Sequence, residues 1–228
     1  MAIYLDHAAT TPLRPEVLEA MLPYLSEHFG NPSSLHAVGR RARKGLDDAR
    51  EEVAAALGAK PREIVFTSGA TENTNLAVSG LAWAGSAQGR HIVTTAVEHR
   101  AVLGTCATLE RHGFGVTVLP VDRYGQVDPN AVAGAIGPHT TTVVIGYANN
   151  EVGTIQPVAE LIGRVRDGGS ALVHVDAVAG AAWLPLDVAA LGADLVSIAA
   201  HKLEGPRGAG ALWIRRGTAL IPQMHGGS

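Results

Sequence analysis

The chain has 228 residues, of which 46% are hydrophobic and 17% charged, and its formal net charge is −3. This length and apolar content suit one large α/β domain, or a large domain with a fragment of a second. No basic stretch dominates, so the charge pattern argues against a protein that binds nucleic acid or an acidic membrane surface. The single cysteine, Cys106, excludes an intramolecular disulfide and a zinc site built from cysteines. With no signal peptide and no apolar run of about 18 residues, we expect a cytoplasmic protein without a membrane span or a bound metal.

The first 58 residues predict two helices joined by a loop. Residues 14–28 place apolar side chains near helical spacing, with a proline in the middle. Residues 29–41 are rich in turn-forming residues and are expected to form the loop. Residues 42–58 carry charge on one face and Ala, Val and Leu on the other, and this pattern stops at Gly58.

From residue 63 onwards, β-rich runs alternate with helical patterns. Helices are expected within 71–85, 101–113, 130–137 and 158–169. Strands are expected within 63–70, 91–99, 115–122, 140–153, 171–180, 193–202 and 210–217. Such alternation is typical of a parallel sheet, and the apolar strands are typical of burial on both faces. The sequence therefore predicts an α/β fold with about seven mainly parallel strands and helices on both faces of the sheet.

Polar residues follow five of the apolar strands, at 67–72, 98–99, 149–151, 176 and 201–202. Each alone has a plain structural explanation, such as a helix cap, a buried histidine or a surface lysine. Ligands of open α/β sheets bind at the carboxyl ends of the strands, however, and these five groups share that edge. We therefore expect a functional site there.

The chemistry of this set fits pyridoxal 5′-phosphate. The segment "SGAT" at 68–71 precedes a helix and offers free backbone amides and a hydroxyl at the positive end of the helix dipole. It lacks the Lys-Ser/Thr ending of a P-loop, which disfavours a nucleoside triphosphate. His99 can stack on a flat ring, Asp176 can pair with a pyridinium nitrogen, and Lys202 can form a Schiff base with an aldehyde.

The chain resembles the N-terminal part of a cysteine desulfurase of the class V aminotransferase family. The matching segments run in the family's order and lie at 4–12, 30–43, 63–77, 98–103, 149–157, 174–178, 201–217 and 223–228. This resemblance implies the fold type I architecture of pyridoxal-phosphate enzymes and a homodimer with active sites near the subunit interface. It also implies that residues 15–228 form the cofactor-binding large domain. Residues 1–14 would belong with a C-terminal small domain that this chain lacks.

The resemblance also implies site roles and a reaction. The reaction is removal of sulfur from L-cysteine to give L-alanine, with the sulfur held as a persulfide. The sulfur then passes to acceptor proteins of the scaffold or tRNA-thiolation type, for iron–sulfur cluster or thionucleoside assembly. The implied catalytic residues are His99, Asp176 and Lys202, which also bind the cofactor. The other implied contacts are Ala70, Thr71 and His201 to the phosphate, and Asn150 to the phenolic oxygen or the substrate carboxylate.

The chain departs from the family pattern at three places. The family's nucleophilic cysteine lies beyond position 228, and Cys106, inside a predicted helix, is interpreted as a buried apolar residue. Ala179 stands where the family has a glutamine that donates to the phenolic oxygen, a loss of about 0.5–1.5 kcal/mol. Ala199 stands where the family has a phosphate-binding serine, and this loss should be larger because that bond is charge-assisted.

Two other functions stay open on the sequence. One is a related class V lyase or aminotransferase that acts on another amino acid. The other is a catalytically silent remnant that serves as a dimerising or binding module, which Ala179 and Ala199 favour.

Overall fold

The sheet of the computed structural model, which describes residues 3–226, has seven strands in the order β1-β7-β6-β5-β4-β2-β3. Strands β3, β2, β4, β5 and β6 run parallel to one another, whereas β7 runs antiparallel to both β6 and β1. The predicted α/β fold with a mainly parallel sheet is therefore confirmed. The strands are β1 Ile64–Thr67, β2 His91–Thr95, β3 Gly115–Leu119, β4 Thr140–Gly146, β5 Leu172–Asp176, β6 Leu195–Ala199 and β7 Gly210–Ile214.

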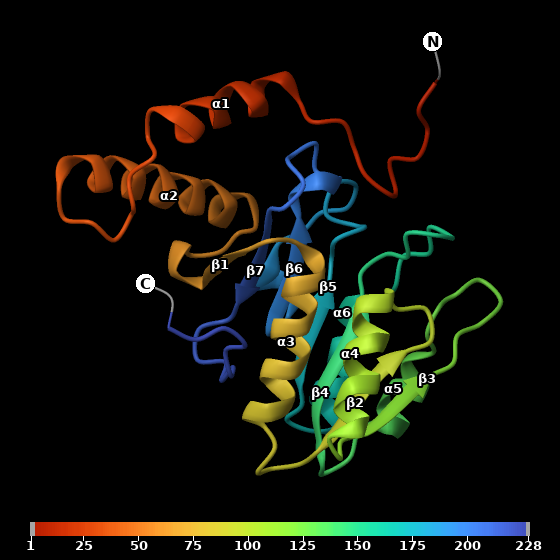
Figure 1. Ribbon diagram of the computed structural model, residues 1–228. Helices are drawn as coiled ribbons and strands as arrows, with labels where there is room; N and C mark the ends of the chain where they lie inside the picture. The colour runs from red at the N-terminus through yellow and green to blue at the C-terminus, as the bar shows by residue number, and fades with distance from the viewer. Residues whose placement is uncertain (1–2, 227–228) are drawn as a thin grey trace.

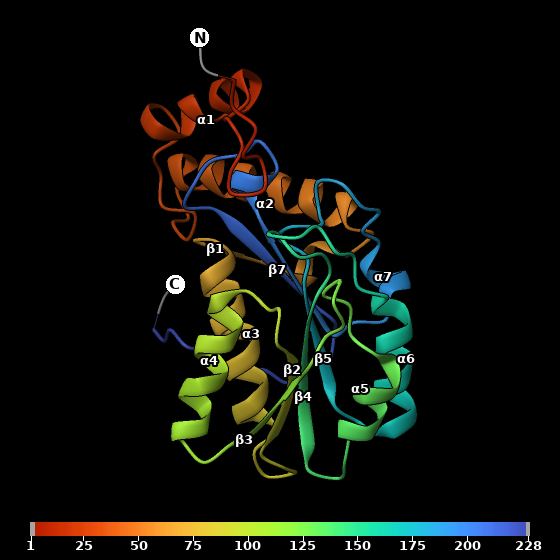
Figure 2. The same ribbon diagram turned by 90° about the vertical axis from the view of Figure 1, so that its right-hand side faces the viewer.

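Helices cover both faces of the sheet (Figure 1, Figure 2). Figure 2 shows α3 and α4 on one face and α5, α6 and α7 on the other, with α1 and α2 together at one end of the molecule. The α-helices are α1 Pro15–Ser26, α2 Ala37–Ala56, α3 Ala70–Ala84, α4 Arg100–Arg111, α5 Pro129–Ala135, α6 Val158–Gly168 and α7 Val188–Leu191. Two 3-10 turns complete the list, η1 Pro61–Glu63 and η2 Ala200–Lys202. Within residues 3–226, no helix has the length and apolar character needed to cross a membrane.

Two helices differ from the prediction. Helix α2 begins at Ala37, five residues before the predicted start at 42, because the His36 side chain accepts a hydrogen bond from the Gly39 amide and caps it. Helix α7 was not predicted at all, since its four residues are too few to show a periodic pattern. Its start is fixed by the Asp187 carboxylate, which accepts from the amides of Ala189 and Ala190.

The apolar core is divided by the sheet into two layers. In the larger cluster, buried side chains on one face of β4, β5 and β6 pack against α5, α6 and the end of α2. The opposite face packs on α3 and α4, with Val78 and Val102 fully buried. Burial on both faces explains the continuous apolar strands, and it leaves polar residues to the strand ends.

The N-terminal segment is tied to the turn that carries the predicted lysine. The amide of Thr11 donates to the carbonyl of His201 (2.8 Å), and the amide of Glu204 donates to the Thr11 hydroxyl (2.8 Å). The amide of Arg14 donates to the carbonyl of Glu204 (3.0 Å). Residues 11–14 thus hold η2 in place, while the assignment of residues 1–14 to a separate small domain stays a prediction.

Candidate active site

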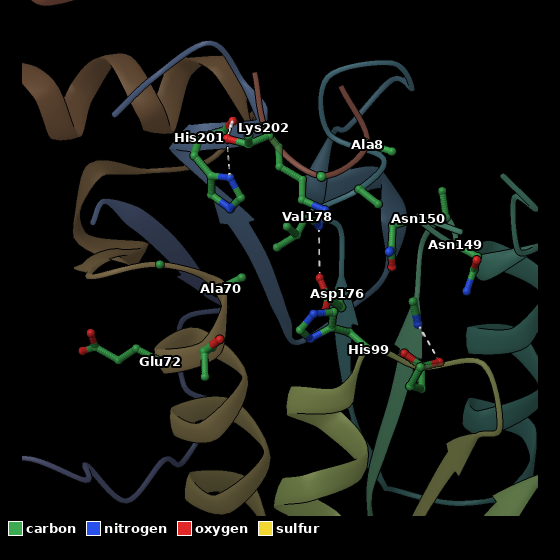
Figure 3. Close-up of a pocket in the computed structure, with 18 of the residues that line it drawn as sticks. Ala8, Ala70, Glu72, His99, Asn149, Asn150, Asp176, Val178, His201 and Lys202 are labelled. Carbon is green, nitrogen blue, oxygen red and sulfur yellow. Dashed lines mark hydrogen bonds between the residues drawn. The ribbon is translucent and has the colours of Figure 1, made fainter. Parts of the chain in front are cut away.

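One cavity of about 600 Å³ lies at the carboxyl edge of the sheet. Figure 3 shows that it is lined from several elements that are distant in the sequence. The structure brings together all seven predicted site residues in its lining: Ala70, Thr71, His99, Asn150, Asp176, His201 and Lys202. Their roles toward a ligand stay predictions, whereas their convergence is a property of the fold.

Lys202 ends the η2 turn after β6 and is half-buried. Its side chain extends toward Asp176 across the cavity (Figure 3). Burial lowers the pKa of its amine, and the charges of Asp176 and Asp6 oppose that shift only in part. A larger fraction of the amine is therefore unprotonated at neutral pH than for a solvated lysine, which favours its use as a nucleophile.

Asp176 is the last residue of β5 and is buried. Its carboxylate accepts one hydrogen bond, from the Val178 amide at 3.1 Å. Burial raises the pKa of this acid, while the Val178 amide and the charges of His99 and Lys202 lower it. A buried acid with one weak partner retains acceptor capacity for a cationic ligand atom.

The start of α3 forms an anion site at the other end of the cavity. Within residues 3–226, the amides of Ala70 and Thr71 donate to no acceptor, and the cap residue Gly69 has no capping side chain. Gly69 has φ of 143°, a left-handed region that favours glycine, and a side chain there would meet open space. A Cβ on Gly210 would lie 2.7 Å from the Gly69 Cα, so glycine at 210 lets β7 pass this turn. Free amides at a helix start bind phosphate.

His201 and Arg207 add hydrogen-bond donors to this end. Both line the cavity, and the His201 Nδ1 lies 3.2 Å from the Thr10 hydroxyl. Burial lowers the pKa of His201, and the charges of Lys202 and Arg207 lower it further. A neutral imidazole at neutral pH remains a hydrogen-bond donor to a phosphate oxygen.

His99 and Asn150 are held by neighbours that carry no predicted role. His99 caps α4, its Nδ1 accepting from the Ala101 amide at 3.1 Å. The Asn149 side chain donates through Nδ2 to the carbonyl of Val97 (2.9 Å), and its Oδ1 accepts from the amides of Glu151 and Val152. Within the described residues, the Asn150 amide has no hydrogen bond, so it remains available to a ligand.

Three further lining residues, Thr10, Glu98 and Arg207, received no role from the sequence. Glu98 precedes His99 at a strand end, and that position is the sequence feature that could have indicated a place in the site. Arg207 follows Lys202 closely in the loop "GPRGAG". Thr10 carries no local signal, because it reaches the site only through the docking of the N-terminal segment on η2.

The three departures from the family pattern fall in different surroundings. Ala179 lines the cavity, so a hydrogen bond is absent at that wall. Ala199 ends β6 and is 1% exposed, and it is not among the lining residues. Cys106 lies in α4, buried, and burial raises the pKa of its thiol to about 12. Its interpretation as a buried apolar residue is confirmed.

Pyridoxal 5′-phosphate fits these residues. The free amides of Ala70 and Thr71 suit its phosphate, the under-paired Asp176 carboxylate suits its pyridinium nitrogen, and the Lys202 amine suits its aldehyde. Within residues 3–226, no group of three or more His, Cys, Asp or Glu side chains is arranged to hold a metal ion. A second cavity of about 510 Å³ adjoins the first and shares Lys202, Asn150 and Ala179 with it.

Comparison with known proteins identifies the relatives of the chain. The cysteine desulfurase IscS of Dictyoglomus turgidum is 52% identical over 226 residues, which cover 99% of this chain and 57% of that protein. The cysteine desulfurase IscS of Methanosarcina thermophila is 49% identical over 227 residues, covering 100% of this chain and 56% of that protein. The chain thus spans a little over half the length of these curated relatives.

Solved structures agree with the sequence matches. A NifS-like protein superposes with a TM-score of 0.97 at 42% identity, covering 100% of this chain and 62% of that one. SspA in complex with cysteine superposes with a TM-score of 0.95 at 40% identity, covering 99% of this chain and 65% of that one. The family model "Aminotransferase class-V" matches residues 3–228. On its sequence, its fold and this match, the chain belongs to the aminotransferase class-V family.

Proposed function

We propose that this protein is a pyridoxal-phosphate-dependent cysteine desulfurase that acts in the cytoplasm. The observation that carries the proposal is the convergence of Lys202, Asp176 and the start of α3 on one cavity. The relatives at about half identity are named cysteine desulfurases, and one structural neighbour, SspA, was solved in complex with cysteine.

The cofactor, when bound, would supply an aldehyde for an amine and an aromatic ring that accepts electrons. The Asp176 carboxylate would hold a proton at the ring nitrogen, because a negative charge in a buried site favours the protonated form. The Lys202 amine would hold the cofactor at its aldehyde, and it would also be the base that takes the proton from the substrate Cα. His99 would lie against the ring face and assist proton movement, while Ala70, Thr71, His201 and Asn150 would fix the cofactor's orientation.

The proposed substrate is L-cysteine and the proposed product is L-alanine. A thiolate would attack the substrate sulfur, so that a sulfur–sulfur bond forms and the carbon–sulfur bond breaks. The carbon fragment would keep the bonding electrons and take up a proton. Cys106 does not supply this thiolate, since it is buried and its pKa is raised to about 12. We therefore place the sulfur-accepting cysteine outside these 228 residues.

We also propose that the protein is a homodimer and passes its sulfur to acceptor proteins. Helix α1 buries none of its residues. Leu22, Leu25 and Phe29 are 51%, 71% and 73% exposed, an apolar surface of the kind that a partner covers. Light scattering of the purified chain tests the assembly: we expect twice the monomer mass, and a clean monomer would contradict it.

Covalent attachment of the cofactor gives the first test. The purified chain mixed with pyridoxal 5′-phosphate should turn yellow, and borohydride should fix the cofactor on the peptide that contains Lys202. The Lys202→Ala variant should show neither the colour nor the added mass, because the bonding amine is gone. Lys44→Ala, which changes an exposed lysine on α2, is the matched control and should behave as the wild type. A colourless wild-type chain would favour the silent remnant instead.

The response to amino acids tests the substrate. L-Cysteine should change the absorbance of the loaded chain at lower concentration than L-alanine, L-glutamate or D-cysteine. An equal or stronger response to another amino acid would favour the related lyase or aminotransferase.

A further inference from the structure

Glu98 is a buried acid at the wall of the cavity that the proposed mechanism does not use. It is 8% exposed, and its Oε1 accepts from the Thr95 hydroxyl at 2.7 Å and from the Gly146 amide at 2.9 Å. Thr95 ends β2 and Gly146 ends β4, so the carboxyl joins two strand ends to the turn that leads into α4. His99 is the next residue in that turn, and its position therefore depends on these contacts.

Glu98 also lies beside Asp176. Gly146 is paired with Asp176 in the register between β4 and β5, and the amide of Tyr147 donates to the Asp176 carbonyl at 2.8 Å. A Cβ on Gly146 would lie 3.1 Å from the Glu98 Oε2, so glycine at this position leaves room for the carboxyl. Two acids therefore share one wall of the site.

The surroundings of the two acids divide the charge between them. Burial, with a smaller contribution from the charge of Asp176, raises the pKa of Glu98 to about 7 against the effect of its two hydrogen bonds. Burial also raises the pKa of Asp176, while the Val178 amide and the charges of His99 and Lys202 lower it in part. Toward Glu98, α4 contributes the Cys106 thiol, which stays neutral, while β2 contributes the hydroxyl of Thr95 and β4 the amide of Gly146. The charge of Asp176 therefore adds to burial in favouring the protonated form of Glu98.

We propose that Glu98 is a positioning residue that holds the turn before α4, and with it His99, as a neutral acid and leaves the negative charge of the pair on Asp176. This inference rests on the proposed function, because its effect on the reaction passes through the ring nitrogen that Asp176 faces. When Glu98 ionises above neutral pH, a second negative charge beside Asp176 increases the proton affinity of that nitrogen. At lower pH Glu98 is neutral, so its charge no longer adds to that of Asp176 in raising the proton affinity of the ring nitrogen.

A pH titration of the loaded chain tests the effect on the cofactor. The absorbance of the wild type with pyridoxal 5′-phosphate should show a transition near neutral pH that Glu98→Gln removes, because the amide keeps an acceptor but does not ionise. Glu110→Gln, an exposed acid at the far end of α4, is the matched control and should keep the transition. Identical titrations of the wild type and Glu98→Gln would overturn the inference.

A titration without cofactor separates this inference from the proposed function. In the wild-type chain labelled with 13C at glutamate carboxyls, the Glu98 signal should titrate near neutral pH. In Asp176→Asn it should titrate at lower pH, because the like charge is gone. A Glu98 midpoint in the range of exposed glutamates, or one unmoved by Asp176→Asn, would overturn the inference even if the cofactor binds. A chain that takes up no cofactor but shows both NMR results would overturn the proposed function and leave the charge division supported.

Discussion

Asp176 ends β5 and Asp194 precedes the adjoining strand β6, so these two buried acids lie at opposite ends of the sheet. Asp194 precedes β6, and its Oδ2 accepts from Arg166 Nη2 and from the Val173 amide, each at 2.7 Å, while Arg215 Nη1 lies 3.4 Å from its Oδ1. Asp176 ends β5 and accepts a single bond of 3.1 Å from the Val178 amide. Asp194 is fully paired within the chain, whereas Asp176 retains acceptor capacity.

This difference separates a structural acid from a functional one. A buried carboxylate costs free energy unless it is paired and hydrogen-bonded. At Asp194 two guanidinium groups offset the free energy of burying the charge. At Asp176, which lines the cavity, that free energy is offset only in part. Acids left under-paired in a cavity are candidates for binding and catalysis. The first of three predictions, in decreasing order of the expected effect, tests a buried histidine between the two acids, and the other two test the acids themselves.

The largest effect is expected from His174, which lies on β5 between the two ends. Its Nε2 lies 2.7 Å from the Ser197 hydroxyl and its Nδ1 is buried without a partner, and burial lowers its pKa to about 3. The folded state therefore binds fewer protons than the unfolded state between pH 6.5 and 3, and stability falls as the pH falls through that window. Between pH 7 and pH 4 the loss should be about 3 kcal/mol, and His174→Gln should reduce it. Urea unfolding at pH 7 and pH 4 measures both, and equal pH dependence in the two proteins would contradict the prediction.

Asp194→Asn should destabilise the fold. The substitution removes a charge that pairs with Arg166 and Arg215, whose side chains are 35% and 43% exposed. Because these guanidinium groups retain contact with water, we expect a loss of about 2 kcal/mol, below the value for a fully buried pair. Urea unfolding at neutral pH is the measurement, and cofactor binding at saturation should be unchanged. An unchanged unfolding midpoint would show that the pairing at this end of the sheet contributes nothing measurable.

The same substitution at Asp176 should have the opposite effect on stability and the smallest one. Burial raises the pKa of this acid, and the charges of His99 and Lys202 offset that effect only in part, so its ionised form is unfavourable in the folded chain and Asp176→Asn should raise the free energy of unfolding. Affinity for pyridoxal 5′-phosphate should fall about 10- to 100-fold, because a bond to a charged nitrogen is lost. Fluorescence titration with the cofactor gives the affinity. A stability loss equal to that of Asp194→Asn would end the contrast between the two acids.

Much of the architecture could be predicted from the sequence. The seven strands follow from apolar runs bounded by turns, and their parallel arrangement follows from the helices between them. The order of the strands and the antiparallel β7 could not be predicted, because no local pattern distinguishes a strand that enters the sheet between β1 and β6. The site edge was predictable, since the carboxyl ends of parallel strands meet at one edge of a sheet.

The residues around the predicted set needed the fold. From the sequence alone, Glu98 cannot be distinguished from a solvated acid at the start of a helix. Only its burial between β2 and β4 gives it a pKa near neutral. Thr10 reaches the site from 191 residues away from His201. Such long-range contacts leave no trace in local propensity or periodicity.

The sequence by itself determined the fold class, the family resemblance and the presence of an amine, an acid and an imidazole at strand ends. These features depend on residue type and on spacing along one strand or helix, which the order of the residues specifies directly. Only the tertiary structure decided which buried acid is paired and which is left open, because a pKa and a hydrogen-bond partner depend on neighbours from other strands. The contrast between Asp176 and Asp194 is therefore a property of the packed sheet.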